Sequence, residues 1–189
     1  MRMMYPPVNG YNFMSRSSFL VTQHTPQIEQ SILDFYLKKA DRFRAYFPGG
    51  EELSGSRPDF LALEGVSVQP WSGMVGCIVA EGTLTPAARA LIRERGKLEE
   101  DGCYHPLELW SYELVNGSEV LLQIEDSSVW ILFATTMELQ SLEKQKIPVS
   151  EWQEISLEPE EGVTPLPMDE SELEQITQAI KEAFFPPNL

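Results

Sequence analysis

The chain has few of the residues from which common catalytic and metal sites are built. Its 189 residues include only two cysteines and two histidines. The cysteines, Cys77 and Cys103, are too few for a disulfide framework, and the sequence contains no CxxC motif or zinc-type Cys/His spacing. We therefore expect both cysteines to pack as small hydrophobic side chains, and we expect no metal and no cofactor.

Long apolar runs are also lacking. The longest ones, which begin at Val129 and Cys77, fall well short of the roughly 18–20 residues that a membrane-spanning helix requires. Positive charge near the N-terminus is followed by Pro6, Pro7 and Gly10, an order that is not typical of a secretory leader. We expect a cytoplasmic protein that does not bind membranes.

Short catalytic motifs are missing as well: the sequence has no P-loop, no G-x-S-x-G, no H-E-x-x-H and no dinucleotide-type glycine spacing. The one arrangement that can support nucleophilic catalysis is Cys103 with His105, which would point to the same face of a strand. The alternative is that both belong to a turn before the next strand. Because catalytic carboxylate pairs leave no short motif, enzyme activity stays open, and we favour a non-catalytic protein.

Acidic side chains, in contrast, are abundant. They outnumber basic ones by 29 to 14, which gives a formal net charge of −15. Residues 1–50 carry a net charge of +3, whereas residues 51–150 and residues 151–189 carry −9 each. A field of this sign repels phosphates and anionic lipids and attracts basic surfaces. We expect a basic protein partner and no direct contact with nucleic acid; the oligomeric state stays open.

Two helices are predicted from Thr-Pro pairs, which are favourable at a helix start. The first begins at Thr25 and continues to Phe47, because apolar residues recur every three or four positions: Ile28, Ile32, Tyr36, Ala40, Phe43 and Phe47. The second begins at Thr85 and ends at Gly96.

The remaining segments of the first 157 residues mostly predict strands. Residues 59–71 and 73–82 indicate a hairpin, and residues 107–136 indicate a three-stranded antiparallel meander with a turn at Asn116. The last strand of the meander is almost wholly apolar, so we expect it to be central in the sheet and covered on both faces. A short helix at 138–146 and an edge strand at 147–157 complete the domain.

The C-terminal part differs in composition. Residues 156–168 form an acidic, proline-rich linker, and residues 169–185 predict an amphipathic helix. We expect this helix to dock on the domain, with docking on another molecule as the alternative. The order of elements predicts a single α+β domain at 1–155 with a mostly antiparallel sheet flanked by helices.

Tryptophan is favoured at protein interfaces, so we consider the four tryptophans as possible partner contacts. We expect two or three of them in the core, with Trp71 and Trp152 the more exposed. These two and nearby carboxylates are the candidate partner-binding residues: Trp71, Glu99, Glu100, Asp101, Trp152 and Glu154.

In composition and element order the chain resembles bacterial toxin-neutralising immunity proteins and secretion-effector chaperones. The resemblance implies an acidic module that neutralises or sequesters a basic protein. We favour the immunity type, because the chain has one large core and one tethered helix. The alternatives are a ligand-binding protein or enzyme with a pocket near Trp110, Tyr112 and Trp130, an effector chaperone, and an inhibitor that mimics nucleic acid.

Overall fold

The computed structural model describes residues 15–48, 57–71, 76–97, 109 and 111–156. The chain divides into two compact units, Met1–Ser156 and Leu157–Leu189, and all described residues belong to the first. The predicted linker and the predicted C-terminal helix lie outside the described residues.

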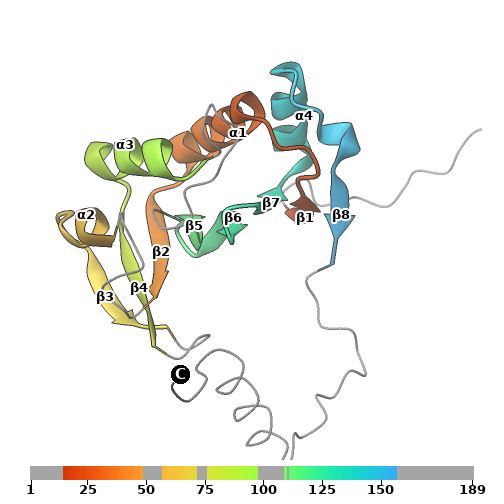
Figure 1. The fold of residues 1–189 in the computed structure, drawn as a ribbon. Helices are drawn as coiled ribbons and strands as arrows, with labels where there is room; N and C mark the ends of the chain where they lie inside the picture. The colour runs from red at the N-terminus through yellow and green to blue at the C-terminus, as the bar shows by residue number, and fades with distance from the viewer. Residues whose placement is uncertain (1–14, 49–56, 72–75, 98–108, 110, 157–189) are drawn as a thin grey trace, which may run out of the picture. The chain divides into compact units, whose positions relative to one another are not determined.

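An eight-stranded antiparallel sheet forms the centre of the described domain (Figure 1). Its strand order is β3-β4-β2-β5-β6-β7-β1-β8. The strands are β1 (Ser17–Leu20), β2 (Arg42–Pro48), β3 (Ser67–Pro70), β4 (Cys77–Thr83), β5 (Ser111–Asn116), β6 (Glu119–Glu125), β7 (Val129–Ala134) and β8 (Gln153–Ile155). With the helices, this sheet confirms the predicted α+β class and the mostly antiparallel pairing.

The described helices lie on one side of the sheet (Figure 1). They are α1 (Pro26–Lys39), α2 (Arg57–Leu61), α3 (Pro86–Arg95) and α4 (Thr136–Lys144), with a short 3-10 turn at Val149–Glu151. The hydroxyls of Thr25, Thr85 and Thr135 each accept a hydrogen bond from a backbone amide in the first turn of α1, α3 and α4. None of the described helices is long and apolar enough to cross a membrane.

Strand β2 shows how the sheet divides into two faces. Phe43, Ala45 and Phe47 are fully buried on the helix side. The rings of Phe43 and Phe47 pack on Phe60 of α2, with centroids 5.6 and 5.7 Å apart. The alternate side chains of β2 therefore point to the opposite face, which we call the open face because no described helix covers it.

Most of the predicted elements are confirmed. Helix α3 begins and ends as predicted, β3 and β4 pair as the predicted hairpin, and β5, β6 and β7 form the meander. Helix α4 and the edge strand β8 are present. Strand β7 lies inside the sheet as expected, but it is covered only in part, because Val129 is 38% exposed.

The first helix is shorter than predicted. It ends at Lys39, and residues 42–48, which we expected to be helical up to Phe47, form β2. The four-residue spacing of Phe43 and Phe47 fits a helix, but four is also a multiple of the two-residue strand period. With Ala45 between Phe43 and Phe47, apolar residues occur at every second position, which is the period of a strand, and the segment forms β2.

Two further differences concern short segments. Residues 57–61 form α2, with Pro58 in its first turn, and this helix includes the first three residues of the strand predicted at 59–71. Strand β1 was not predicted. Its four residues, SSFL, do not alternate between polar and apolar types, and all four are half-buried. Its place between β7 and β8 therefore depends on strand pairing.

Candidate binding face

The open face carries a row of ion pairs across three neighbouring strands. In the register of the sheet, Arg44 of β2 lies directly between Glu81 of β4 and Glu113 of β5. Its guanidinium Nη1 lies 3.0 Å from the Glu113 carboxylate, and its Nε lies 3.7 Å from Glu81. Arg42 pairs diagonally with Glu81. We call these four residues the ion-pair ladder; cross-strand pairs of opposite charge stabilise a sheet.

The ladder is partly accessible to solvent and is balanced in charge. The side chains of Arg42 and Arg44 are 44% and 32% exposed, and those of Glu81 and Glu113 are 17% and 14% exposed. The guanidinium groups are therefore the outermost part of the ladder. Planar guanidinium groups carry five donors in a fixed geometry and are common in protein interfaces.

Two aromatic side chains border the ladder. The ring of Trp71, just after β3, packs against the ring of Tyr46 in β2, with centroids 4.9 Å apart. The Trp71 amide donates to the Cys77 carbonyl at 2.9 Å, which fixes Trp71 beside β4. Burial and then the Glu113 carboxylate, which accepts a hydrogen bond from the hydroxyl, raise the pKa of Tyr46 to about 12. Tyr46 is therefore neutral and bound to the ladder at physiological pH.

An apolar area continues the open face across β7, β1 and β8. The register places Ile131 of β7 opposite Leu20 of β1, and Phe133 opposite Ser18, which in turn faces Ile155 of β8. Leu20, Phe133 and Ile155 are half-buried. The open face thus combines paired charges, the packed rings of Tyr46 and Trp71, and partly exposed apolar side chains.

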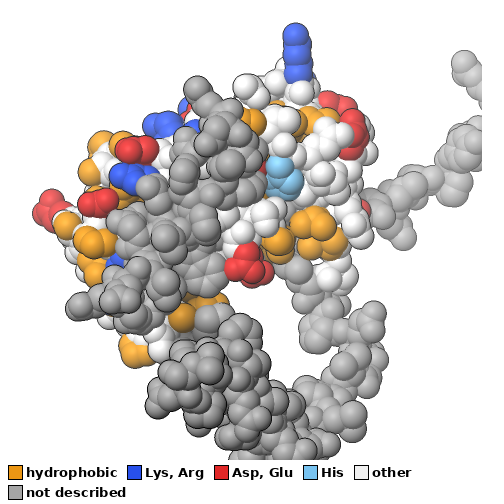
Figure 2. All heavy atoms as spheres, in the orientation of Figure 1, with side chains coloured by type: hydrophobic (Ala, Val, Ile, Leu, Met, Phe, Trp, Pro, Cys, Tyr) orange, Lys and Arg blue, Asp and Glu red, His pale blue; other side chains and the backbone are white. Residues whose placement is uncertain are grey.

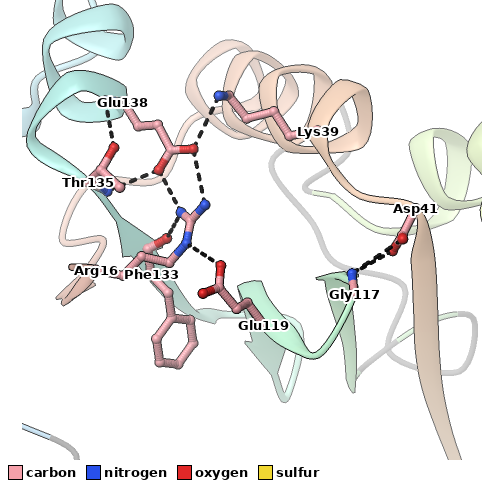
Figure 3. A network of polar contacts seen from close by, with 8 residues as sticks. All are labelled: Arg16, Lys39, Asp41, Gly117, Glu119, Phe133, Thr135 and Glu138. Atoms are coloured by element: carbon pink, nitrogen blue, oxygen red, sulfur yellow. Dashed lines mark hydrogen bonds and ion pairs between the residues drawn. The ribbon is translucent and has the colours of Figure 1, made fainter. Parts of the chain in front are cut away.

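A second polar network lies at the other end of the domain and ties elements together (Figure 3). Arg16 donates to the Phe133 carbonyl at 2.7 Å and to the Glu138 carboxylate at 2.6 Å, and it also pairs with Glu119. Lys39 reaches the same Glu138 carboxylate at 3.1 Å. Glu138 also accepts from the Thr135 amide. Arg16, Lys39 and the Thr135 amide already occupy the Glu138 carboxylate, so we assign this network to stabilising the fold and not to binding a partner.

The candidate partner-binding residues lie in different places. Trp71 is half-buried on the open face, and Glu154 is exposed on β8. Trp152 is only 8% exposed and belongs to the hydrophobic core, so the expectation that it is an exposed tryptophan is wrong. Glu99, Glu100 and Asp101 lie outside the described residues.

The residues proposed for a pocket or for catalysis are placed as follows. Trp130 and Tyr112 are buried in the core; the Trp130 indole donates to the Ser127 carbonyl at 3.1 Å, and the Tyr112 hydroxyl donates to the Gly96 carbonyl at 2.6 Å. Trp110, Cys103 and His105 lie outside the described residues. Within the described ranges, no group of three or more His, Cys, Asp or Glu side chains is arranged to hold a metal ion.

Sequence reasoning missed the ladder because it assigned Arg42 and Arg44 to the end of a helix. The signal was the alternation of basic and apolar residues from 42 to 45, which places both arginines on one face of a strand. The carboxylate partners come from strands about 40 and 70 residues away, so their pairing depends on the sheet register.

The negative charge is concentrated outside the described residues. The described residues carry 12 basic and 15 acidic side chains, a net charge of −3, whereas the others carry 2 and 14, a net charge of −12. In Figure 2, acidic, basic and apolar side chains are intermingled on the coloured surface. The described surface by itself is therefore not strongly acidic.

Comparison with known proteins does not place the chain in a family. No protein-family model matches the chain, and no curated protein or solved structure matches it either.

Proposed function

We propose that this chain is a non-catalytic protein-binding module that neutralises or sequesters a more basic protein, as an immunity-type inhibitor does. The observation that carries the proposal is the open face, where Arg42, Arg44, Tyr46 and Trp71 lie together on a surface that no described helix covers. Arginine, tyrosine and tryptophan are the residue types that contribute most to binding at protein interfaces.

The basic character of the partner follows from the sequence. A net charge of −15 favours encounters with positively charged proteins. Since the described residues account for only −3 of it, the attraction at long range comes mainly from the other segments. The open face would supply the contacts at short range, where its paired aromatic rings offer a rigid apolar surface beside charged groups.

The buried positions of Trp130 and Tyr112 weigh against the alternative of a pocket lined by these two residues. Both side chains pack in the core, and both polar atoms bind backbone carbonyls, so neither is directed toward a ligand. The proposal therefore assigns binding to the surface of the sheet.

The proposal is tested with a partner isolated on the full-length chain at low salt and then purified. We expect Trp71→Ala and Tyr46→Ala each to weaken binding by about tenfold or more, which corresponds to about 1.4 kcal/mol. Met137→Ala is the matched control, because Met137 is 66% exposed on α4, away from the open face. Its affinity should equal that of the wild type.

Two outcomes would count against this function. Unchanged affinity in folded Trp71→Ala and Tyr46→Ala proteins would exclude the open face as the binding surface. A purified partner with an acidic surface would exclude the electrostatic part. If the partner is an enzyme, an immunity-type inhibitor should reduce the turnover of that enzyme in proportion to the amount of complex formed.

A further inference from the structure

His24 occupies a position in which both ring nitrogens face acceptors. It lies in the connection between β1 and α1, with Nδ1 2.8 Å from Glu29 Oε1 and Nε2 3.1 Å from the Val21 carbonyl oxygen. An ionised carboxylate and a carbonyl only accept hydrogen bonds, so satisfying both contacts requires a proton at each nitrogen.

The surroundings make this proton important. Glu29 is completely buried, while the His24 side chain is 24% exposed. The hydrogen bond to Glu29 is the largest cause that raises the pKa of His24 above 6.5; burial opposes it, and the Glu29 charge and the Val21 carbonyl add to it. Loss of one proton leaves the neutral ring with a single N–H, so either the Glu29 carboxylate or the Val21 carbonyl then faces the lone pair of a ring nitrogen.

The same connection holds one edge of the sheet. The Thr22 hydroxyl donates to the Glu151 carbonyl at 2.8 Å, and the Gln23 amide donates to the Glu151 carboxylate. Glu151 ends the 3-10 turn just before β8, and β8 pairs with β1 and, within the described part of the chain, with no other strand. Movement of residues 21–25 would therefore reach β8 directly.

We propose that His24 and Glu29 form a pH-sensitive latch. In its protonated form the latch holds the β1–α1 connection, the 3-10 turn and β8 together, and its deprotonation loosens this edge of the sheet. The contribution of the latch to stability is complete below pH 6.5 and is lost as the pH rises through the higher folded-state pKa of His24. The device acts whatever partner the open face binds.

Carboxylates from two of the described elements contact this connection. Helix α1 contributes Glu29, and the 3-10 turn contributes Glu151, whose carboxylate accepts a hydrogen bond from Gln23. Strand β7 contributes Trp130, whose ring lies edge-on to His24 with centroids 6.4 Å apart and does not titrate. Variants at Glu29 and Glu151 therefore separate the latch from a general charge effect.

The test combines an NMR titration of the His24 ring with hydrogen exchange of residues 149–155 in the full-length chain, with exchange rates corrected for their intrinsic dependence on pH. His24→Gln identifies the ring signal by its loss. We expect a His24 midpoint above pH 6.5 and a loss of protection in 149–155 at that same midpoint. Glu29→Gln, which keeps the shape and removes the charge, should lower the midpoint and abolish the linked loss of protection.

Glu151→Gln is the matched control and should keep both the midpoint and the linked step. A wild-type midpoint at or below 6.5 would overturn the proposal, as would protection in 149–155 that does not follow the midpoint. If Glu29→Gln does not fold, the decision passes to His24→Gln: retention of the pH-dependent step in that variant would equally refute the latch.

Discussion

Replacing Glu138 by Gln tests whether the network around it joins β1 to the rest of the domain. The Glu138 carboxylate is only 8% exposed and receives hydrogen bonds or ion pairs from Arg16, Lys39 and the Thr135 amide. Removing one member of a buried pair typically costs about 3–5 kcal/mol. Arg16 would keep the Phe133 carbonyl and Glu119, so we expect a smaller loss of about 2–3 kcal/mol in the free energy of unfolding.

The assay is urea unfolding at neutral pH, supported by thermal unfolding. For a chain of this size, each kcal/mol lowers Tm by about 2–4 °C, so a decrease of roughly 4–12 °C is expected. Gln can still accept from the Thr135 amide, so the helix cap is kept and the charge is the main change. Glu143→Gln is the control, because Glu143 is exposed on the same helix and its replacement should change stability by less than about 0.5 kcal/mol.

Acid provides an independent check on the same residue. Burial by itself would raise the pKa of Glu138, but the hydrogen bonds from the Thr135 amide, Arg16 and Lys39 outweigh burial and lower it below 4.5. The stabilisation is present above pH 4.5 and is lost as the pH falls through the folded-state pKa. Glu138→Gln should therefore lose less stability than the wild type on acidification. Equal stability of Glu138→Gln and wild type at neutral pH would refute the reasoning.

Three further predictions address other parts of the chain. Ultraviolet difference absorbance should show one tyrosine with a midpoint near pH 12, absent in Tyr46→Phe; its contribution to stability is complete below pH 10 and is lost as the pH rises through 12. Gly96→Ala should destabilise the domain by about 1–3 kcal/mol in urea unfolding, because the added Cβ would lie 2.6 Å from the Tyr112 hydroxyl oxygen. Truncation after Pro167 should lower Tm and increase binding of an apolar dye, because the predicted C-terminal stripe must be buried; unchanged values would contradict the expected docking.

The elements that the sequence predicted well are those with strong local signals. Helix α3 lies between Thr85 and Gly96, each of which has a specific role at a helix end. The hairpin between β5 and β6 turns at Gly117, whose positive φ of 59° suits glycine. In such segments the residues within one turn of a boundary carry enough information to place it.

The features that were missed depend on contacts between distant segments. Strand β1 pairs with β7 and β8, which follow more than 100 residues later, and its four residues have no periodic pattern of their own. The ion-pair ladder required the register of β4, β2 and β5, and the latch required His24 to face the first turn of the next helix. Local spacing does not contain these relationships.

The division of charge between the described residues and the others has a kinetic consequence for the proposed function. The described residues carry −3 and the others −12, so long-range attraction and short-range contact depend on different parts of the chain. Added salt should reduce the association rate with a basic partner steeply and change dissociation little, because screening acts mainly on separated charges. Trp71→Ala should instead accelerate dissociation and leave the salt dependence of association unchanged, because it removes buried contact and no charge. An association rate that does not depend on salt would remove the electrostatic component while leaving the open face as a possible contact surface.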